Sequence, residues 1–418
     1  MKVRFLEGHR IIRSGHRYFV LILASAILLR LIWIALVPVV PLSDGLAYDQ
    51  LARNIVDLGM YGASMDKPSA YWPVGTPALY ALLYWIFGFH YLPIAFFNVL
   101  LVIVIITCTV RLARRSLATW PTVDTVAGMM LAVWPTLIMY VTILASELAF
   151  MAAMLLAIDL WTNKDRTIWI RGLGAGVFLA VACYVRPPAL LLPIVLFICQ
   201  LAVREPVRRC IAVLVIAVST MIVLISPWTI RNYRVLGEPV LISSNGGSNL
   251  WIGNHPGADG EYTGLPERVS GLSEVEASRV LGAEAREFIL SDIPGFVRRT
   301  LTRVFVTYRK ETVGVVWNQR GIESTFGSEA LPPLKVISSG YWLLMLALAF
   351  AGVMLAVYRQ RSAFKVATNP LLLSTAYVAA VHAVFMGSDR FHLASIPAVS
   401  VFAAIAVSSC LGLFVRQQ

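Results

Sequence analysis

The strongest constraint in this sequence is a series of apolar runs, each about as long as a bilayer core is thick. Roughly 20 apolar residues in a helix cross a hydrocarbon core of about 30 Å. Charged residues make up only 14% of the 418 residues, against roughly 25% in soluble domains. The runs predict an all-α polytopic membrane protein and exclude soluble, disordered, fibrous and disulfide-scaffold classes.

Ten segments are predicted to cross the membrane. The first follows a basic segment and is too long for the core of a signal peptide, so we expect it to remain as an anchor. The ten segments are 18–40, 91–110, 120–141, 147–161, 169–184, 188–203, 210–229, 338–357, 370–386 and 392–414.

The short loops on the two sides of these spans differ in basic residues. Those on the side of the N-terminus hold eighteen Lys and Arg, and those on the other side hold only Arg53, Lys67, Arg186 and Arg390. Basic residues collect in cytoplasmic loops, so we expect both termini inside a bacterial cytoplasmic (inner) membrane. This distribution accounts for the net charge of +12 without nucleic acid as a partner.

Two segments are expected outside the membrane, 41–90 and 230–337. They divide the chain into an N-terminal membrane module (1–229) with its first outer loop, a loop domain (230–337) and C-terminal membrane helices (338–418). The first loop is predicted to hold a helix over 45–58 and an interfacial or re-entrant run over 77–87.

The second outer segment is expected to be mixed but mainly helical. A capping-box pattern at Ser273 and Glu276 predicts one helix. Pro294 opens another helix, with apolar residues along one face and arginines interspersed. That helix either lies on the membrane surface or packs on the rest of the loop.

The cysteines and histidines show no metal-ligand or disulfide pattern. All five cysteines lie inside or at the ends of apolar runs and no CxxC occurs, so they are predicted to pack as small apolar residues. The six histidines lack metal-ligand spacing. We expect no required cofactor, with a divalent cation between Asp44 and Glu147 as an alternative.

Charged residues at the outer ends of the spans require an explanation, because a charge at the centre of a span costs about 2.5–3.5 kcal/mol. If the outer loops converge, one site would collect Asp44, Asp49, Glu147, Arg186, Arg390 and His392, with Lys67, Arg231 and Arg234 beside them. Basic groups bind phosphate and a carboxylate accepts a proton. These residue types together predict a site that handles an anion.

Six short pieces of the sequence form a recognisable series. They are Ser43-Asp44-Gly45-x-x-Tyr48, Lys67-Pro68-x-x-x-Trp72-Pro73-x-Gly75, Ser146-Glu147-Leu148, Arg231-Asn232-Tyr233, Asn249-Leu250-Trp251-Ile252-Gly253-Asn254 and Asp389-Arg390-Phe391-His392. Together they resemble the GT-C glycosyltransferases, in particular the glycosyltransferase family 39-like group of lipid A aminoarabinose transferase and protein O-mannosyltransferases. The resemblance covers most of the chain in order and topology. It departs from the family at Gly45, where an acidic residue is usual.

The resemblance implies transfer of a sugar from a polyprenyl-phosphate donor to a lipid, glycan or protein acceptor at the outer face. By position in the family motif, Asp44 is the general base, with a helix N-cap as its structural alternative. A single base implies inversion at the sugar carbon. Glu147 would orient the acceptor, or simply mark the end of a span.

The remaining candidates divide between the donor phosphate and the pocket. Lys67 and Arg390 are the preferred phosphate ligands, while Arg186, Arg231 and Arg234 are also explained by interfacial snorkelling. Candidate sugar or acceptor contacts are Tyr48, Tyr71, Trp72, Asn249, Trp251, Asn254, His255 and His392. Turn chemistry for the loop residues and an interfacial aromatic belt for Tyr71 and Trp72 remain alternatives.

Three other functions compete with this hypothesis. A secondary transporter favours charges and broken helices at the bilayer centre, whereas these spans are nearly free of charge and the 108-residue loop would be unexplained. An O-antigen polymerase or ligase also uses arginine-rich outer loops but does not account for Asp44. A non-catalytic assembly partner is the third alternative.

Overall fold

Long apolar helices form the body of the protein. The computed structural model describes residues 2–117, 120 and 122–415, with side chains over 17–412 of these. Among these described residues, six helices are long and apolar enough to cross a membrane. They are α1 (Lys2–Leu36), α4 (Leu92–Ser116), α8 (Ile168–Val185), α10 (Val207–Leu236), α16 (Leu331–Gln360) and α19 (Ile396–Val415).

A seventh span is broken in its middle. Helices α5 (Val123–Ala132) and α6 (Pro135–Met139), the latter continued by η1 (Tyr140–Thr142), pass the length and hydropathy test together but bend by 54°. The guanidinium of Arg30 donates to the carbonyls of Leu131 (3.2 Å) and Ala132 (2.9 Å) at the break. Buried carbonyls at the end of a helix need such partners in an apolar medium, so Arg30 stabilises the break.

All ten predicted spans fall on helices, but the count of ten is not confirmed. Besides the six long helices and the broken span, the remaining three predicted spans lie on shorter helices. They are α7 (Glu147–Thr162), η2 with α9 (Pro187–Leu191 and Leu192–Ala202) and α18 (Pro370–Phe385). Helix α7 is buried on nearly every side, because it is apolar all round and lies inside the bundle.

The first predicted outer segment folds as expected, with one addition. Helix α2 (Asp44–Leu58) and helix α3 (Gly75–Phe87) match the two predicted helices. Between them lies an antiparallel hairpin of β1 (Gly62–Ser64) and β2 (Lys67–Pro68), which the sequence analysis did not anticipate.

The second predicted outer segment is helical, as expected. Ser273 caps α12 by accepting a hydrogen bond from the Glu276 amide (3.2 Å), and α13 begins at Ile293, beside Pro294. Its elements are α11 (Gly246–Asn254), η3 (Glu267–Val269), α12 (Glu274–Ser291), α13 (Ile293–Tyr308), α14 (Val313–Val316), α15 (Gln319–Phe326) and η4 (Ser328–Ala330).

Helix α13 does not pack its apolar face on the loop. Val297, Leu301 and Phe305 are exposed, whereas Arg303 is fully buried. This arrangement differs from the packed alternative, because the buried face is held by the Arg303 guanidinium donating to backbone carbonyls of Ala383 and Gly253.

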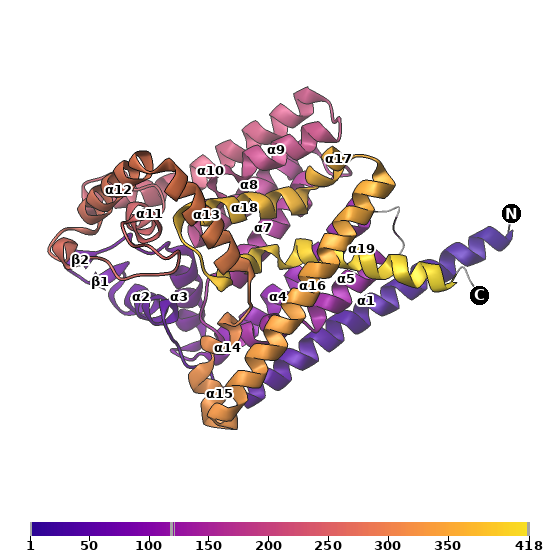
Figure 1. The fold of residues 1–418 in the computed structure, drawn as a ribbon, viewed down its shortest axis with the longest axis horizontal. Helices are drawn as coiled ribbons and strands as arrows, with labels where there is room; N and C mark the ends of the chain where they lie inside the picture. The colour runs from indigo at the N-terminus through magenta and orange to yellow at the C-terminus, as the bar shows by residue number, and fades with distance from the viewer. Residues whose placement is uncertain (1, 118–119, 121, 416–418) are drawn as a thin grey trace.

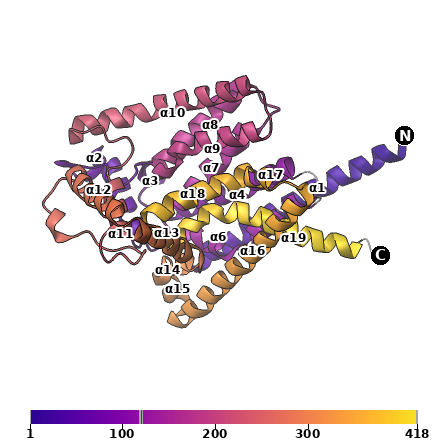
Figure 2. The same cartoon turned by 45° about the horizontal axis from the view of Figure 1, so that its top comes forward.

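Two short elements complete the chain, and the outer segments gather at one end of the bundle. Helix α17 (Ala363–Ala367) follows α16, and η5 (Asp389–Ser395) leads into α19. Figures 1 and 2 show α2, α3, the hairpin and α11–α13 at the end opposite the labelled termini.

Candidate active site

Asp44 and Arg390, 346 residues apart in sequence, form an ion pair. Asp44 is the first residue of α2, and Ser43 holds the N-cap position with φ of 51°. The N-cap role considered for Asp44 is therefore not the one observed. Arg390 comes from η5, and each side chain of the pair is 15% exposed, so a ligand could reach both.

Glu147 and Arg186 form a second ion pair at the ends of two adjacent helices. Glu147 is the first residue of α7, where the helix dipole favours a negative charge. Arg186 directly follows α8 and its Nη1 lies 3.1 Å from Oε1 of Glu147. The other oxygen, Oε2, is buried and has no hydrogen-bond partner among the described residues.

One aromatic ring joins the two ion pairs. The guanidinium carbon of Arg186 lies 5.2 Å from the centre of the Phe391 ring, and that of Arg390 lies 4.9 Å from it. Asp44, Glu147, Arg186 and Arg390 therefore form one group of charges, which we call the charged cluster. Its members come from α2, α7, the end of α8 and η5.

Close backbone packing brings the first two elements together. A Cβ at Gly45 would lie 2.8 Å from the carbonyl oxygen of Leu144, so glycine allows α2 to approach the segment before α7. The Tyr80 hydroxyl binds both the amide (2.9 Å) and the carbonyl (3.1 Å) of Ala145. The departure from the family at Gly45 thus has a structural reason.

Three predicted pocket aromatics lie next to Asp44. Tyr48 is one helical turn after Asp44, its ring lies 5.6 Å from Trp72, and Trp72 lies 5.5 Å from Tyr71. Burial raises the pKa of Tyr48 above its usual value, and the charges of Asp44 and Glu147 raise it further. Its phenol therefore stays protonated at neutral pH and can donate a hydrogen bond.

Arg231 and Lys67 lie away from the charged cluster, at the hairpin. Arg231 donates to the carbonyls of Ser69 (2.7 Å) and Tyr61 (2.6 Å), which flank the hairpin. Lys67 is exposed on β2. Arg231, Tyr61 and Trp228 line a hollow of about 530 Å³, which we call the hairpin hollow.

Contacts through Trp72 connect the hairpin hollow with the charged cluster. The Tyr61 hydroxyl donates to the carbonyl of Trp72 (2.8 Å), and the Trp72 ring contacts Tyr48. The predicted phosphate ligands thus form two groups, Arg390 with Arg186 and Lys67 with Arg231, on either side of these aromatics. Arg234 is exposed on α10.

Most predicted contacts on α11 and after it are engaged in the fold. The Asn254 amide donates to the carbonyls of Leu250 and Val384, both at 2.9 Å. Trp251 donates to Glu284 (3.1 Å), and one face of its ring stacks on His255 at 4.3 Å. Asn249 is half-buried with no side-chain hydrogen bond to a described residue.

His392 is buried in a polar network that the sequence analysis missed. Its Nε2 lies 3.1 Å from Oε1 of Glu311, and Nδ1 lies 2.7 Å from the carbonyl of Thr307. Trp134 also donates to Glu311, and His392 stacks on Trp342 at 4.0 Å. Glu311 follows Arg309 and Lys310 in sequence and resembles a surface charge there, so no local signal marked its burial.

Asp49, another acid of the first outer loop, is bound to its neighbours. It accepts hydrogen bonds from Arg53 (3.0 Å), Tyr91 (3.0 Å) and Tyr84. These contacts hold α2 against α3.

Within the described residues, no group of three or more His, Cys, Asp or Glu could hold a metal ion. Asp44 and Glu147 each bind an arginine instead.

Comparison with known proteins identifies this architecture. A sequence model of the dolichyl-phosphate-mannose-protein mannosyltransferase family matches residues 69–230. The structure of the Archaeoglobus fulgidus oligosaccharyltransferase, tethered with an acceptor peptide, is similar over 94% of this chain, at 14% identity and a TM-score of 0.54. The chain has the fold of a GT-C glycosyltransferase. This confirms the predicted fold class and the resemblance.

Two further structures are similar to this chain. They are those of ArnT from Cupriavidus metallidurans bound to undecaprenyl phosphate (16% identity, TM-score 0.46) and in the apo state (15% identity, TM-score 0.44). Each covers 94% of this chain, which covers 77% and 78% of the ArnT chains.

The extent of these similarities differs between proteins. This chain spans half the length of the archaeal oligosaccharyltransferase chain. No curated protein sequence matches it significantly. The segment matched by the mannosyltransferase model includes Glu147 and Arg186, whereas Asp44 and Arg390 lie outside it.

Proposed function

We propose that the chain is a membrane glycosyltransferase. It moves a sugar from a polyprenyl-phosphate donor to an acceptor at the extracytoplasmic face, with inversion at the sugar carbon. The observation that carries this proposal is the charged cluster, in which Asp44 and Glu147, the first residues of α2 and α7, each contact an arginine.

Asp44 acts as the general base. It takes the proton from an acceptor hydroxyl while that oxygen attacks the anomeric carbon of the donor sugar. The bond from this carbon to the phosphate oxygen breaks, and its electron pair leaves with the phosphate. Because phosphate is a good leaving group, one base and positive charge suffice for this reaction.

The ion pairs give the cluster a way to respond to the donor. A phosphate competes with Asp44 for Arg390 and with Glu147 for Arg186, because each guanidinium binds either anion. Binding of the donor phosphate would release the Asp44 carboxylate to face the acceptor. The buried Oε2 of Glu147, which has no hydrogen-bond partner among the described residues, then accepts a hydrogen bond from the acceptor and orients it.

The donor approaches along the hairpin hollow. Its isoprenoid tail requires apolar surroundings and its phosphate requires cations. The hollow offers both, since Trp228 and Val235 lie beside Arg231. Lys67 and Arg231 would bind the phosphate on entry, and the sugar would then reach Asp44 past Tyr48, Tyr71 and Trp72, whose rings suit stacking on a sugar.

Asp44→Asn tests the base directly. Loss of a general base lowers the rate by about 10²–10⁴-fold, while the amide keeps the size of the side chain. Asp57→Asn is the matched control, because Asp57 is an exposed acid on the same helix. Mass spectrometry of envelope glycolipids and glycoproteins would compare a deletion strain that carries each variant. Wild-type amounts of product with Asp44→Asn would contradict the proposal.

A further inference from the structure

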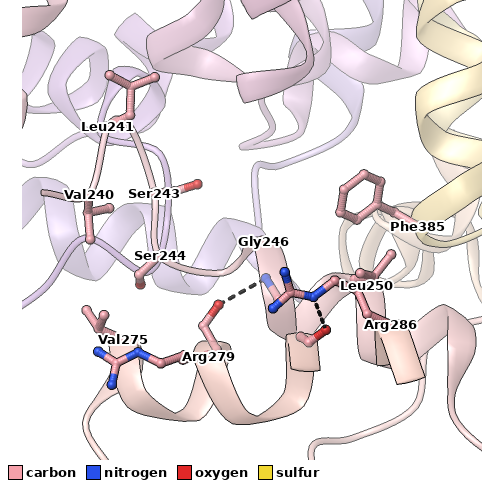
Figure 3. Close-up of a pocket in the computed structure, with 13 residues that line it drawn as sticks. Val240, Leu241, Ser243, Ser244, Gly246, Leu250, Val275, Arg279, Arg286 and Phe385 are labelled. Atoms are coloured by element: carbon pink, nitrogen blue, oxygen red, sulfur yellow. Dashed lines mark hydrogen bonds between the residues drawn. The ribbon is translucent and has the colours of Figure 1, made fainter. Parts of the chain in front are cut away.

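A second hollow in the structure has two arginines of one helix in its lining. It measures about 480 Å³ and lies between the loop after α10, the start of α11, α12 and the end of α18. Figure 3 shows Leu241 and Ser243 on one side, Phe385 on another, and Arg279 and Arg286 extending from α12. We call it the α12 hollow.

Its two arginines differ in their partners. Arg279 pairs with Glu238 across an exposed surface. Arg286 donates to the Gly282 carbonyl (3.1 Å) on its own helix and pairs with no carboxylate in the described part of the chain. None of the described residues that line the hollow is acidic, and Ser243, Ser244 and Ser278 contribute hydroxyl groups to its lining. The lining is therefore suited to an anionic group with several oxygen atoms.

An apolar hollow adjoins it at the level of the spans. This hollow, which we call the α9–α10 groove, measures about 330 Å³ and is lined by Leu190 and Pro193 on one side and Val218, Ile222 and Ile225 on the other. Leu241 lines both hollows. The Thr229 hydroxyl of α10 donates to the carbonyl of Leu241 (3.1 Å), which holds the loop after α10 against this helix where the two hollows meet.

The α9–α10 groove lies on a different face of α10 from the hairpin hollow. Ile222, Ile225 and Thr229 line the groove, whereas Trp228 and Arg231 line the hairpin hollow. At 100° per residue these two sets point in clearly different directions around the helix. Helix α10 thus separates two hollows. The hairpin hollow contains Arg231, and the groove adjoins the α12 hollow with Arg279 and Arg286.

Aromatic contacts connect the α12 hollow with the charged cluster. Phe385 lines the hollow, and one turn earlier on α18 the His382 ring stacks on Phe391 at 4.0 Å. Phe391 in turn contacts Arg186 and Arg390. A head group in this hollow therefore lies beside the wall of the site at which transfer is proposed.

We propose that the α9–α10 groove and the α12 hollow form one binding site for a lipid with an anionic head group. The acyl chain lies in the groove and the head group contacts Arg286 and Arg279. This inference rests on the proposed function in one respect, that the bound lipid is the acceptor. Donor and acceptor lipids then approach the charged cluster from two sides of α10.

The test measures binding of dioleoyl phosphatidic acid to the full chain by native mass spectrometry, with dioleoyl phosphatidylcholine for comparison. Arg286→Gln and Ile222→Trp should each weaken binding of phosphatidic acid about tenfold, because one removes a charge-assisted contact and the other fills the groove. The controls are Arg320→Gln, an exposed arginine without an ion pair among the described residues, and Val223→Trp, an exposed neighbour outside the groove. Both controls should bind as the wild type does.

Two results would overturn the lipid site. One is wild-type binding by both test variants. The other is weaker binding by Arg286→Gln alone, which would show a contact with a head group or free phosphate and no tail in the groove.

Transfer assays separate the acceptor role from the proposed function. With the acceptor identified by mass spectrometry, Arg286→Gln should raise the KM for the acceptor and leave the KM for the donor unchanged. A raised donor KM alone would overturn the acceptor role. A wild-type protein that binds phosphatidic acid through Arg286 but transfers no sugar would contradict the proposed function and leave the lipid site standing.

Discussion

Helices α7 and α8 carry arginine–carboxylate pairs at both of their ends, and the two ends differ in how completely those pairs are satisfied. At one end Glu147 meets Arg186. At the other end Asp159 of α7 binds Arg111 (3.0 Å) and Arg115, and Arg171 of α8 binds Glu205. Arg171 and Arg186 are separated by about 22 Å along the helix.

Oδ1 of Asp159 faces Arg115 without a hydrogen bond among the described residues, so the complete pair at this end is that of Arg171. Its guanidinium binds both oxygens of Glu205, at 2.6 and 3.1 Å, and its Nε donates to the carbonyl of Trp161 at 2.9 Å. At the Glu147 end, the carboxylate has one contact of 3.1 Å, and its other, buried oxygen has no hydrogen-bond partner in the part of the chain that the structure describes. The same residue types thus stabilise the fold at one end and leave bonding capacity for a ligand at the other.

The largest effect on stability is expected at the pair of Arg171 and Glu205. Arg171→Gln should lower the free energy of unfolding by about 3–5 kcal/mol, because it leaves the Glu205 charge buried and unpaired. Thermal unfolding in detergent would measure the loss. The double variant Arg171→Gln with Glu205→Gln should recover part of it, since no buried charge remains. An Arg171→Gln protein as stable as the wild type would show that the pair is not a structural anchor.

The largest effect on activity beyond Asp44 is expected at Arg390. Arg390→Gln should lower kcat/KM for the donor by about 10²–10³-fold, because it removes positive charge from the departing phosphate. We expect Arg390→Lys to retain more activity than Arg390→Gln. If Arg390→Gln transferred sugar at the wild-type rate, the only role of Arg390 would be to hold Asp44 in place.

A smaller effect on activity is expected at Gly45. Gly45→Ala should lower kcat by about 10–100-fold, because its methyl group would push α2 and Asp44 away from Leu144, and small misplacements of a catalytic group are costly. Gly340→Ala is the control, since Gly340 also lies in a helix (α16) and a Cβ there meets no atom within 4 Å. Equal activity in the two variants would mean that α2 tolerates displacement.

The smallest effect concerns how the stability contributed by Glu205 depends on pH. Burial raises the pKa of Glu205, but the hydrogen bond and charge of Arg171 outweigh it and hold the pKa below the usual value of 4.5. A carboxyl group with a lowered pKa in the folded state stabilises the protein fully above that value and loses its contribution as the pH falls further.

The difference in unfolding free energy between wild type and Glu205→Gln should therefore narrow as the pH falls below about 4.5. Unfolding of both proteins across this range would measure it. A difference that stays constant at acid pH would contradict the charged state of Glu205.

Particular residues show where sequence reasoning succeeded. Helix α7 begins at Glu147, as the span 147–161 predicted, and α2 begins at Asp44, one residue before the predicted start at Gly45. The roles of residues 249–255 were less accessible, because an Asn or Trp in a glycine-rich loop looks the same whether it faces a ligand or the backbone. Only the fold shows that Asn254 binds the carbonyl of Val384, 130 residues away.

The sequence by itself determined that the chain crosses a membrane and which charges stand at the ends of its helices, because both follow from local hydropathy and the rise of a helix. The tertiary structure alone decided which cation faces which carboxylate. Arg390 reaches Asp44 across 346 residues, whereas Arg231 binds the carbonyls beside the hairpin. Such pairings depend on how closely helix ends approach one another, as at Gly45, and local sequence does not encode that distance.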